Sequence, residues 1–413
     1  MAHTLTIDLT PAEHHDMLSA YQKDGEKKWV TADVTVDDTT VSDVAVRLKG
    51  NSTLMTLRSD GNRPPGLPED AEFGADFVPD EAMIAMSASA DDPTSLPLLI
   101  SFDENAEGRG YQGLTELSVR PGTPVLNESL ALSLTAETGQ PSQRYAYARY
   151  TINGRTTTRL LLEHPDETYA NTLFDSDGYL YKADANSRME FVGTDQSAYS
   201  DQFKQINSAD NGNLQPIINF LEWLDSADQE EFDAHLSDWF DTDSLARYLA
   251  TQNLLVNGDD MGGPGQNYYL WFDLETKKLS VISWDLNLAM HGDATAGPVE
   301  KIQMGPPGGL GANIRAGTQT VTPGAAGPGP AHDNPLKTRF LESENWADAY
   351  NREYWELYDE MYADGKAHNV LDEILATIPE TDGLSEQELA TAADSMHKWI
   401  DERVTALDDA RGE

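Results

Sequence analysis

The sequence has no cysteine, few basic residues and no long apolar run. Because none of its 413 residues is cysteine, disulfides, thiolate metal sites and cysteine nucleophiles are excluded. No stretch approaches the roughly 20 apolar residues that a membrane-spanning helix needs, so we expect no transmembrane segment. The first ten residues, MAHTLTIDLT, also lack the basic and apolar regions of a signal peptide.

Positive charge is scarce. The chain has 28 lysine and arginine residues against 71 acidic residues, a formal net charge of −43 at pH 7. Such a chain repels a phosphate backbone unless its basic residues gather on one face, and the sequence has no basic cluster, so we expect no nucleic-acid partner. The acidic residues are spread along the chain, which favours a solvated surface over an acidic binding patch. Since salt screens the self-repulsion, we expect an extracellular or cell-surface protein whose secretion signal is absent from this sequence.

The first third of the chain is predicted to be rich in strands. Thr10 as N-cap, Pro11 at the first helical position and Gly25 beyond the end predict one early helix. Alternating or continuous apolar residues predict strands in the segments WVTADVTVDD, VSDVAVRLKG, LPLLISFDE and LTELSVR. Proline, glycine and aspartate predict a long loop over residues 59–93.

The middle of the chain begins with a predicted helix over residues 126–138, with Asn127 as its cap and Gly139 at its end. Two strands follow, joined by a turn at Asn153 and Gly154. After the predicted strand GYLYKAD, helical spacing of apolar residues indicates helices in LQPIINFLEWLD, DQEEFDAHLSDWF and TDSLARYLATQNLLVN.

The C-terminal part is predicted to be helical, with apolar stripes that we assign to core packing. A Gly- and Pro-rich segment at residues 295–335 is predicted to be a loop. Strands first and helices later predict a single α+β domain over residues 1–413. We expect a β-rich lobe over about residues 1–185 and a mainly helical lobe over about residues 186–413.

The stretch from 253 to 287, NLLVNGDDMGGPGQNYYLWFDLETKKLSVISWDLN, suggests phosphoryl transfer. That chemistry needs one carboxylate that orients the acceptor hydroxyl and another that holds a metal ion against the phosphates. Asp259 lies on a loop after a helix, Asn267 lies where the loop becomes a strand, and Asp285 lies at the exit of a hairpin. Protein kinases have these groups in the same order. The alternative is an acidic turn and hairpin on the surface.

Asp285 is the stronger part of this hypothesis. It follows an apolar strand, and burying a carboxylate without a partner costs several kcal/mol. A divalent cation is a natural partner, and the oxygen ligands of Asp259, Asn267, Asp285 and Asn287 suit Mg²⁺ or Mn²⁺ with phosphate completing the shell.

Several segments resemble the spore-coat protein H (CotH) kinase family. In chain order they are VRLKGNST, LPLLISFDE, GQPSQRYAYARYTING, LLLEHPDETY, GYLYKAD, NGDDMGGPGQNYYLW and VISWDLNLAM. The resemblance runs over roughly residues 30 to 340 and is most specific at 257–271 and 281–290. It implies an atypical protein kinase fold and ATP-dependent, metal-dependent phosphorylation of serine or threonine on secreted or coat proteins.

The resemblance also implies roles for single residues. Asp259 stands at the family's catalytic aspartate, Asp285 at its metal-binding aspartate, and Asn267 at the asparagine before its aromatic strand. Lys182, in the Leu-Tyr-Lys motif, is the candidate for neutralising the nucleotide phosphates, with Glu163 as a possible partner.

A second phosphate-binding candidate is the strand-to-turn segment with Arg47, Lys49 and Gly50, although an ordinary hairpin turn explains it equally well. The expected ligands are ATP and Mg²⁺ or Mn²⁺, with a protein that offers a serine or threonine as substrate.

Other functions stay open. A degenerate kinase fold could serve as a surface or adhesion module. A hydrolase is disfavoured because the sequence has neither an H-x-x-x-H motif nor a nucleophile elbow. A calcium loop at residues 175–184 fails in its ligand spacing after Gly178.

Overall fold

The computed structural model describes residues 3–50, 52–57, 88–208, 212–302 and 334–412. The predicted loop at 59–93 and the Gly- and Pro-rich segment at 295–335 lie largely outside these residues. None of the helices in the described part of the chain has an apolar stretch long enough to cross a bilayer.

Seven N-terminal strands form a closed barrel. In the order in which they pair they are β1 (His3–Asp8), β2 (Val30–Val36), β3 (Thr39–Leu48), β4 (Leu98–Ser101), β5 (Glu116–Val119), β7 (Arg155–Glu163) and β6 (Tyr145–Ile152). All neighbours are antiparallel except β1 and β6, whose parallel pairing closes the barrel. Closure leaves no free sheet edge, and side chains from alternating strand positions fill the interior as one apolar core.

The helix caps and the hairpin turn that were predicted in this region are confirmed. Helix α1 (Pro11–Asp24) begins where the hydroxyl of Thr10 accepts the Glu13 N–H at 3.2 Å, and it ends at Gly25 with φ 73°. Between β6 and β7, Asn153 and Gly154 both have positive φ, as a tight hairpin turn requires.

A second sheet combines the two halves of the sequence. It has the order β11-β10-β8-β9, from strands β8 (Gly178–Ala183), β9 (Phe203–Gln205), β10 (Tyr268–Asp273) and β11 (Leu279–Ser283). Strand β8 lies before residue 185, yet it pairs with β10 and not with the barrel. The boundary expected near residue 185 therefore runs through this sheet.

The rest of the described chain is mainly helical. The α-helices are α3 (Leu126–Glu137), α4 (Tyr169–Leu173), α5 (Gln215–Ser226), α6 (Gln229–Trp239), α7 (Thr242–Leu254), α8 (Pro335–Glu342), α9 (Glu344–Met361), α10 (Lys366–Leu375) and α11 (Glu386–Arg411). Short 3-10 helices are η1 (Ser52–Leu57), η2 (Pro93–Ser95), η3 (Gln196–Tyr199), η5 (Leu286–Leu288) and η7 (Ala363–Gly365).

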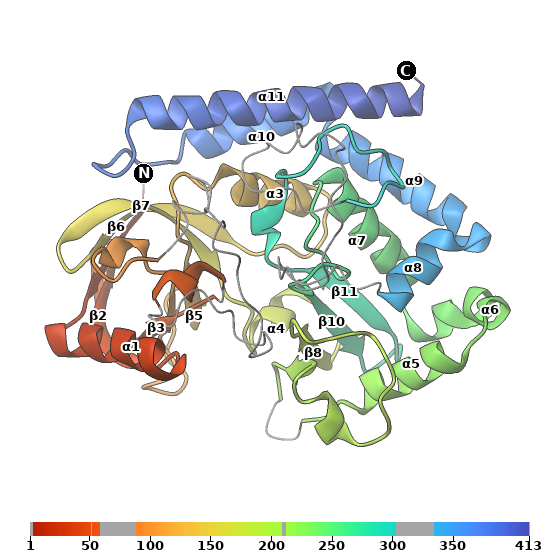
Figure 1. Ribbon diagram of the computed structural model, residues 1–413, viewed down its shortest axis with the longest axis horizontal. Helices are drawn as coiled ribbons and strands as arrows, with labels where there is room; N and C mark the ends of the chain where they lie inside the picture. Colours follow the sequence, from red (N-terminus) through yellow and green to blue (C-terminus); the bar gives the residue numbers. More distant parts are fainter. Residues whose placement is uncertain (1–2, 51, 58–87, 209–211, 303–333, 413) are drawn as a thin grey trace, which may run out of the picture.

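The helices and the second sheet, with residues of β6 and β7, share a second and larger apolar core. The C-terminal helix α11 lies beside α10 along one side of the molecule, and the barrel lies at the opposite end from α5 and α6 (Figure 1). Tyr354 and Leu357 of α9 and Ile400 and Leu407 of α11 are fully buried in this core, which confirms that the C-terminal stripes are packing surfaces. The fold is α+β, with a β-rich N-terminal region and a helical C-terminal part.

The prediction that Asn127 caps α3 is wrong. The N-cap is Val125, and Asn127 lies inside the helix. Its side-chain amide donates to the backbone oxygens of Asn287 at 2.6 Å and Ala289 at 3.1 Å. Helix α3 therefore uses this polar group to hold the segment that follows Asp285.

Candidate functional site

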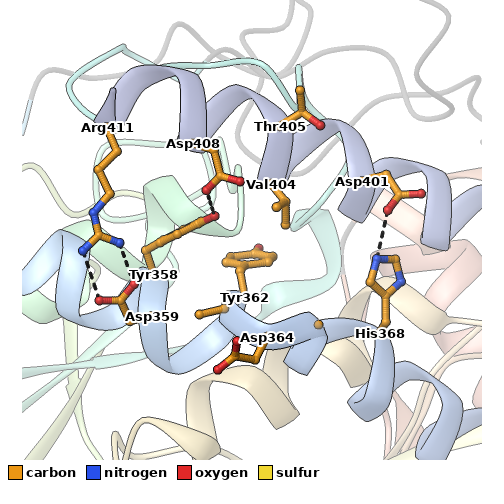
Figure 2. A pocket seen from close by; sticks show the side chains of 12 residues that line it. Tyr358, Asp359, Tyr362, Asp364, His368, Asp401, Val404, Thr405, Asp408 and Arg411 are labelled. Carbon is orange, nitrogen blue, oxygen red and sulfur yellow. Dashed lines mark hydrogen bonds and ion pairs between the residues drawn. The ribbon is translucent and has the colours of Figure 1, made fainter. Parts of the chain in front are cut away.

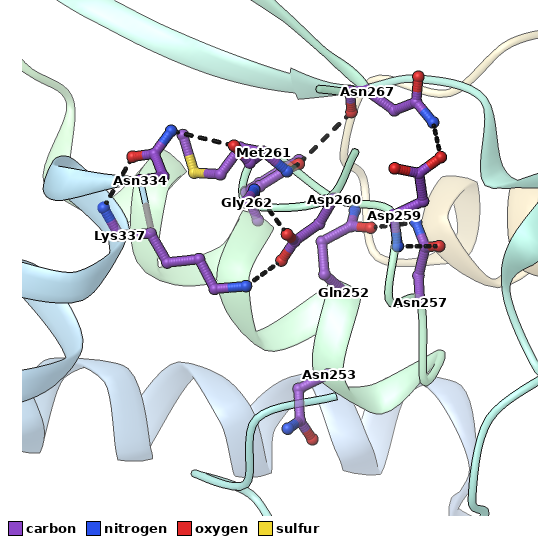
Figure 3. Close-up of polar contacts among 12 residues, drawn as sticks. Gln252, Asn253, Asn257, Asp259, Asp260, Met261, Gly262, Asn267, Asn334 and Lys337 are labelled. Carbon is purple, nitrogen blue, oxygen red and sulfur yellow. Dashed lines mark hydrogen bonds and ion pairs between the residues drawn. The ribbon is translucent and has the colours of Figure 1, made fainter. Parts of the chain in front are cut away.

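The loop after α7 closes tightly around Asp259 (Figure 3). One carboxylate oxygen accepts the N–H of Gly265 at 2.6 Å. The other accepts the side-chain amide of Asn267 at 3.0 Å, as Figure 3 shows. A Cβ atom on Gly263 would lie 2.4 Å from Asp259 Cα, and one on Gly265 would lie 2.6 Å from Asp259 Oδ2. The glycines are required because the loop could not approach the carboxylate this closely with side chains in place.

The start of this loop is joined to the second sheet. Asn257 donates its backbone N–H to Gln252 O at 2.8 Å and its side-chain amide to Gln252 Oε1 at 2.7 Å. Gln252 in turn donates to the hydroxyl of Ser283, in β11, at 2.9 Å. Val256 has φ 49°, a conformation unfavourable for a β-branched residue, and such strain persists only where the surroundings impose it. These contacts fix Asp259 relative to the strand that ends next to Asp285.

Asp260 has a different environment from its neighbour. Its carboxylate accepts the Gly262 N–H at 2.8 Å and forms an ion pair with Lys337 of α8 (Figure 3). Asn334, the N-cap of α8, donates its side-chain amide to Met261 O at 3.0 Å. The second aspartate therefore anchors the loop to α8, while the first lies in the glycine turn.

Asp285 lies at the exit of β11 with φ 56° and ψ 59°, in the strained left-handed region. Its Oδ1 pairs with Arg120, which follows β5. Arg120 also forms two hydrogen bonds to Glu128 of α3, whose side chain is fully buried. The sequence analysis missed both residues, although a glutamate in the apolar helix LNESLALSL signals a buried charge that needs a partner.

The two aspartates of the site have different protonation properties. Burial raises the pKa of Asp285, but the positive charges of Arg120 and Lys49 outweigh it, so the pKa lies below its usual range. Burial, followed by the charges of Asp285 and Asp260, raises the pKa of Asp259 to about 6 against the hydrogen bonds that it accepts. One carboxylate is thus kept ionised, and the other can exchange a proton near neutral pH, as acid–base catalysis requires.

Basic side chains from distant segments gather around Trp284. Lys49, directly after β3, and Lys182, in β8, each have Nζ 5.1 Å from the centre of the Trp284 ring. Lys49 also donates to the hydroxyl of Ser118 at 2.7 Å. Arg47 stacks over Trp29 at 4.6 Å. In a chain of net charge −43, this is a local concentration of positive charge.

Burial, and after it the charges of neighbouring cations, lower the pKa values of the lysines in this cluster. Burial, together with the charge of Arg120, lowers the pKa of Lys49 to about 7. Burial, together with Arg47 and Lys182, lowers the pKa of Lys27 to about 8. Burial also lowers the pKa of Lys182, although Asp285 opposes this. An anion placed among these groups would reverse the shifts, so the cluster suits phosphate oxygens.

His164 borders the same cluster. Its ring lies edge-on to Trp284 at 5.5 Å, and its Nδ1 is buried without a hydrogen-bond partner among the described residues. Burial, with the charges of Lys49 and Lys182, lowers its pKa well below the usual value, so the ring is neutral at pH 7.

The structure brings most of the predicted site residues together. Asp259 contacts Asn267, and the charge of Asp285 acts on the pKa of Asp259. Lys49 and Lys182 in turn act on the pKa of Asp285. Arg47 lies at the border of this cluster, where it lowers the pKa of Lys27 and Lys182.

Glu163 does not belong to the site. It forms an ion pair with Arg144 at 2.6 Å and accepts the Arg144 backbone N–H at 3.1 Å. The prediction that Glu163 is the partner of Lys182 is therefore wrong, because the barrel register brings Glu163 to the start of β6. Asn287 is held near Asp285 through its backbone oxygen, and its role in metal binding stays a prediction.

The donor atoms fit a metal ion that is shared with a phosphate. Within residues 3–302 and 334–412, as far as they are described, no three His, Asp or Glu side chains converge into a metal site. Two side-chain oxygens, Oδ2 of Asp285 and Oδ1 of Asn267, accept no hydrogen bond from the described residues. These are hard oxygen ligands, and Mg²⁺ is usually held by one or two carboxylates together with substrate phosphates.

A cavity of about 340 Å³ lies elsewhere, between the end of α9 and α11 (Figure 2). Its lining includes the carboxylates of Asp359, Asp364, Asp401 and Asp408. Three of these pair with neighbouring residues, as Asp401 does with His368 at 3.1 Å. An acidic cavity of this kind repels phosphate, so it is not part of the candidate site.

A β-rich N-terminal region, a helical C-terminal part, and carboxylates and lysines that converge between them are features of protein-kinase-like proteins. The family model described as CotH kinase protein matches residues 121–407. The chain belongs to the CotH kinase family. Two of the motifs that suggested this family, VRLKGNST and LPLLISFDE, precede the matched residues, and the match extends through most of α11.

Two solved structures show a weaker likeness. The Helicobacter pylori proinflammatory kinase CtkA has 13% sequence identity and a TM-score of 0.34, over 76% of this chain and 91% of its own. A chain of the Shewanella oneidensis MR-1 complex of HipA, HipB and operator DNA, a toxin–antitoxin system, has 11% identity and a TM-score of 0.33, over 72% of this chain and 60% of its own. Both TM-scores are low, so the family assignment rests on the family model. No curated protein matches the sequence.

Proposed function

We propose that this protein transfers the γ-phosphoryl group of ATP to a serine or threonine hydroxyl of a protein substrate, with Mg²⁺ or Mn²⁺ as cofactor. The observation that carries the proposal is the placement of two unlike carboxylates beside a cationic cluster. Asp285 is kept ionised by Arg120 and Lys49, and Asp259 has a pKa of about 6. Membership of a kinase family supports the use of ATP.

Each group has a role in this proposal. Lys49 and Lys182 would bind the nucleotide phosphates, and Asp285 and Asn267 would hold the metal ion. When bound, the ion supplies neutralisation of the charge on the transferred phosphoryl group. Asp259 orients the acceptor hydroxyl and accepts its proton. Arg120 is itself held by its ion pair with Glu128, and it keeps Asp285 in position through a second ion pair.

The extracellular or cell-surface location remains part of the proposal. Its support is the acidic, solvated composition of a chain of net charge −43. Fractionation of the native cells tests it, since recovery of the protein with the cytoplasmic fraction alone would contradict this location.

We expect the purified protein to incorporate labelled phosphate from γ-labelled ATP into serine or threonine of an added protein, and to lose this activity in EDTA. ATP with Mg²⁺ should also raise the melting temperature, because a ligand that binds only the native state stabilises it by about 2.7 kcal/mol at 100 times its Kd. Phosphoamino-acid analysis and a thermal-shift titration measure the two effects.

The same experiment separates the proposal from its alternative, a degenerate kinase fold that acts as a binding module. The contact of Arg120 with Asp285 favours that alternative, because the arginine occupies a carboxylate oxygen. A thermal shift without phosphate transfer would support the alternative. Absence of both effects at millimolar ATP would rule out a nucleotide site.

Lys49 provides a test of the phosphate-binding role. Its pKa of about 7 means that the amine is mostly neutral at pH 8 and mostly charged at pH 6. Phosphate bound beside it should raise this pKa, so we expect ATP binding to take up a proton at pH 8 and much less at pH 6. Calorimetric titrations in buffers of different ionisation enthalpy measure this uptake.

Lys49→Met should abolish the proton uptake and weaken ATP binding about tenfold or more, which corresponds to about 1.4 kcal/mol. Lys277→Met, at the exposed tip of the hairpin between β10 and β11, is the matched control and should leave both unchanged. Equal proton uptake in wild type and Lys49→Met would assign the uptake to another group.

A further inference from the structure

Arg403 of α11 is fully buried, with 0% of its surface exposed. It forms no ion pair with a carboxylate in the described part of the chain. All of its hydrogen bonds go to neutral oxygens, and most of these are backbone carbonyls. A buried charge without a direct ion-pair partner is costly, so an apolar side chain would fill the same space at a lower cost in free energy.

The first set of contacts is at the C-terminal end of α7. Arg403 Nε donates to Leu254 O at 3.2 Å, and Nη2 donates to the backbone oxygen of Asn253 at 2.9 Å and to its side-chain oxygen at 3.1 Å. The last carbonyls of a helix lack intrahelical partners and carry the negative end of the helix dipole. The guanidinium therefore caps the helix that leads into the Asp259 loop.

The second set of contacts is on the segment that follows Asp285. Arg403 Nη1 donates to Ala294 O at 3.0 Å and also to Ala296 O. The same segment is joined to the end of α7 by the hydrogen bond from Met290 N–H to Leu255 O at 2.7 Å. One side chain thus connects the chain just before Asp259 with the chain just after Asp285.

We propose that Arg403 is a positioning residue for phosphoryl transfer, which sets the distance between the Asp259 loop and the Asp285 segment. This inference rests on the proposed function. Arginine suits the role because its planar guanidinium presents five N–H donors in a fixed arrangement, whereas lysine offers three on a flexible stem. A misplacement of reacting groups by 1 Å can cost about 100-fold in rate, so a loss of this connection should act mainly on kcat.

The test compares Arg403→Gln and Arg403→Lys with Arg411→Gln. The control residue is on the same helix, but it forms a partly exposed ion pair with Asp359. We expect Arg403→Gln to lower kcat about 100-fold while the KM for ATP changes by less than about threefold, because Lys49 and Lys182 bind the phosphates from other elements. Arg403→Lys should restore little of the rate, and Arg411→Gln should behave as wild type.

Hydrogen exchange gives a second readout that does not depend on activity. In Arg403→Gln, the amides of residues 253–260 and 290–300 should exchange faster, while those of the barrel strands stay unchanged. A kcat within threefold of wild type in a folded variant would overturn the inference. Uniformly faster exchange across α7, α9 and α11 would also overturn it, since Arg403 would then only stabilise the fold.

The two proposals can fail separately. If the wild-type protein transfers no phosphate, the proposed function fails, and the exchange pattern still decides whether Arg403 holds the two segments together. If the wild type is active and folded Arg403→Gln retains its full kcat, the positioning role fails while the phosphotransferase proposal stands.

Discussion

Asp285→Asn is expected to abolish phosphate transfer, with a fall in kcat/KM of about 1,000-fold or more. A metal ion at a transferring phosphoryl group stabilises the transition state by several kcal/mol, and each 1.36 kcal/mol is a factor of ten in rate. Asparagine keeps the size of the side chain but removes the charge that we propose to hold the ion. The assay is ATP-dependent phosphate transfer over a range of Mg²⁺ and Mn²⁺ concentrations.

The fold should survive this substitution. Arg120 keeps its two hydrogen bonds to the buried Glu128, so the arginine charge still has a counter-charge. The pKa of Asp285 is lowered in the folded protein, so its ionised form stabilises the fold above the unfolded pKa, and this contribution is lost as the pH falls through the folded pKa. The stability difference between wild type and Asp285→Asn should therefore shrink in acid.

Asp273→Asn is the matched control for this prediction. Asp273 ends β10 on the same hairpin, where its carboxylate accepts the backbone N–H groups of Glu275 at 2.8 Å and Thr276 at 2.7 Å. Its loss should cost some stability at the turn but leave the phosphate transfer rate within about twofold of wild type. Retention of more than a tenth of the wild-type activity by folded Asp285→Asn would remove Asp285 from metal binding.

The sequence predicts the elements whose signals are local. The caps of α1 at Thr10 and Gly25, the turn at Asn153 and Gly154, and the apolar stripes of the C-terminal helices all depend on residues close in sequence. Closure of the barrel depends instead on the parallel pairing of β1 with β6, which are separated by more than a hundred residues. No local pattern specifies such a pairing, so the sequence predicted strands but not a barrel.

The candidate site shows the same division. The order of Asp259, Asn267 and Asp285 along the loop and hairpin is a local pattern, and the structure brings Asp259 and Asn267 into contact as this pattern suggests. The ion-pair partners of the charged residues could not be predicted, because each charged residue of the barrel or of a helix has many possible partners elsewhere in the sequence. Arg120 and Glu128 were missed for this reason.

Two wrong predictions have a related cause. Glu163 pairs with Arg144 and not with Lys182, since the pairing of β6 with β7 decides which side chains meet. Asn127 was predicted to be a helix cap, because asparagine is common at the N-cap position. In the structure its side-chain amide instead donates to the segment after Asp285. A polar residue near a helix start can therefore serve a distant segment instead of its own helix.

Asp259→Asn is expected to lower kcat by about 100- to 10,000-fold, the usual contribution of a general base. The KM for ATP should change little, because the lysines that we propose to bind the phosphates are on β8 and after β3. Steady-state kinetics with saturating metal measure both constants. An unchanged kcat in the folded variant would mean that Asp259 does not accept the proton of the acceptor hydroxyl.

The same variant should also change the pH dependence of stability. In the protein without metal or nucleotide, the pKa of Asp259 is raised to about 6, so the native state binds this proton more tightly than the unfolded state. Stability should therefore fall as the pH rises from about 4 to about 6, by roughly 3 kcal/mol for a shift of about two pKa units. Asparagine does not titrate. The melting temperature of Asp259→Asn minus that of the wild type should therefore increase over this pH range and then level off. A constant difference from pH 4 to pH 8 would contradict the raised pKa, and with it the view that burial near Asp285 and Asp260 prepares this carboxyl for proton transfer.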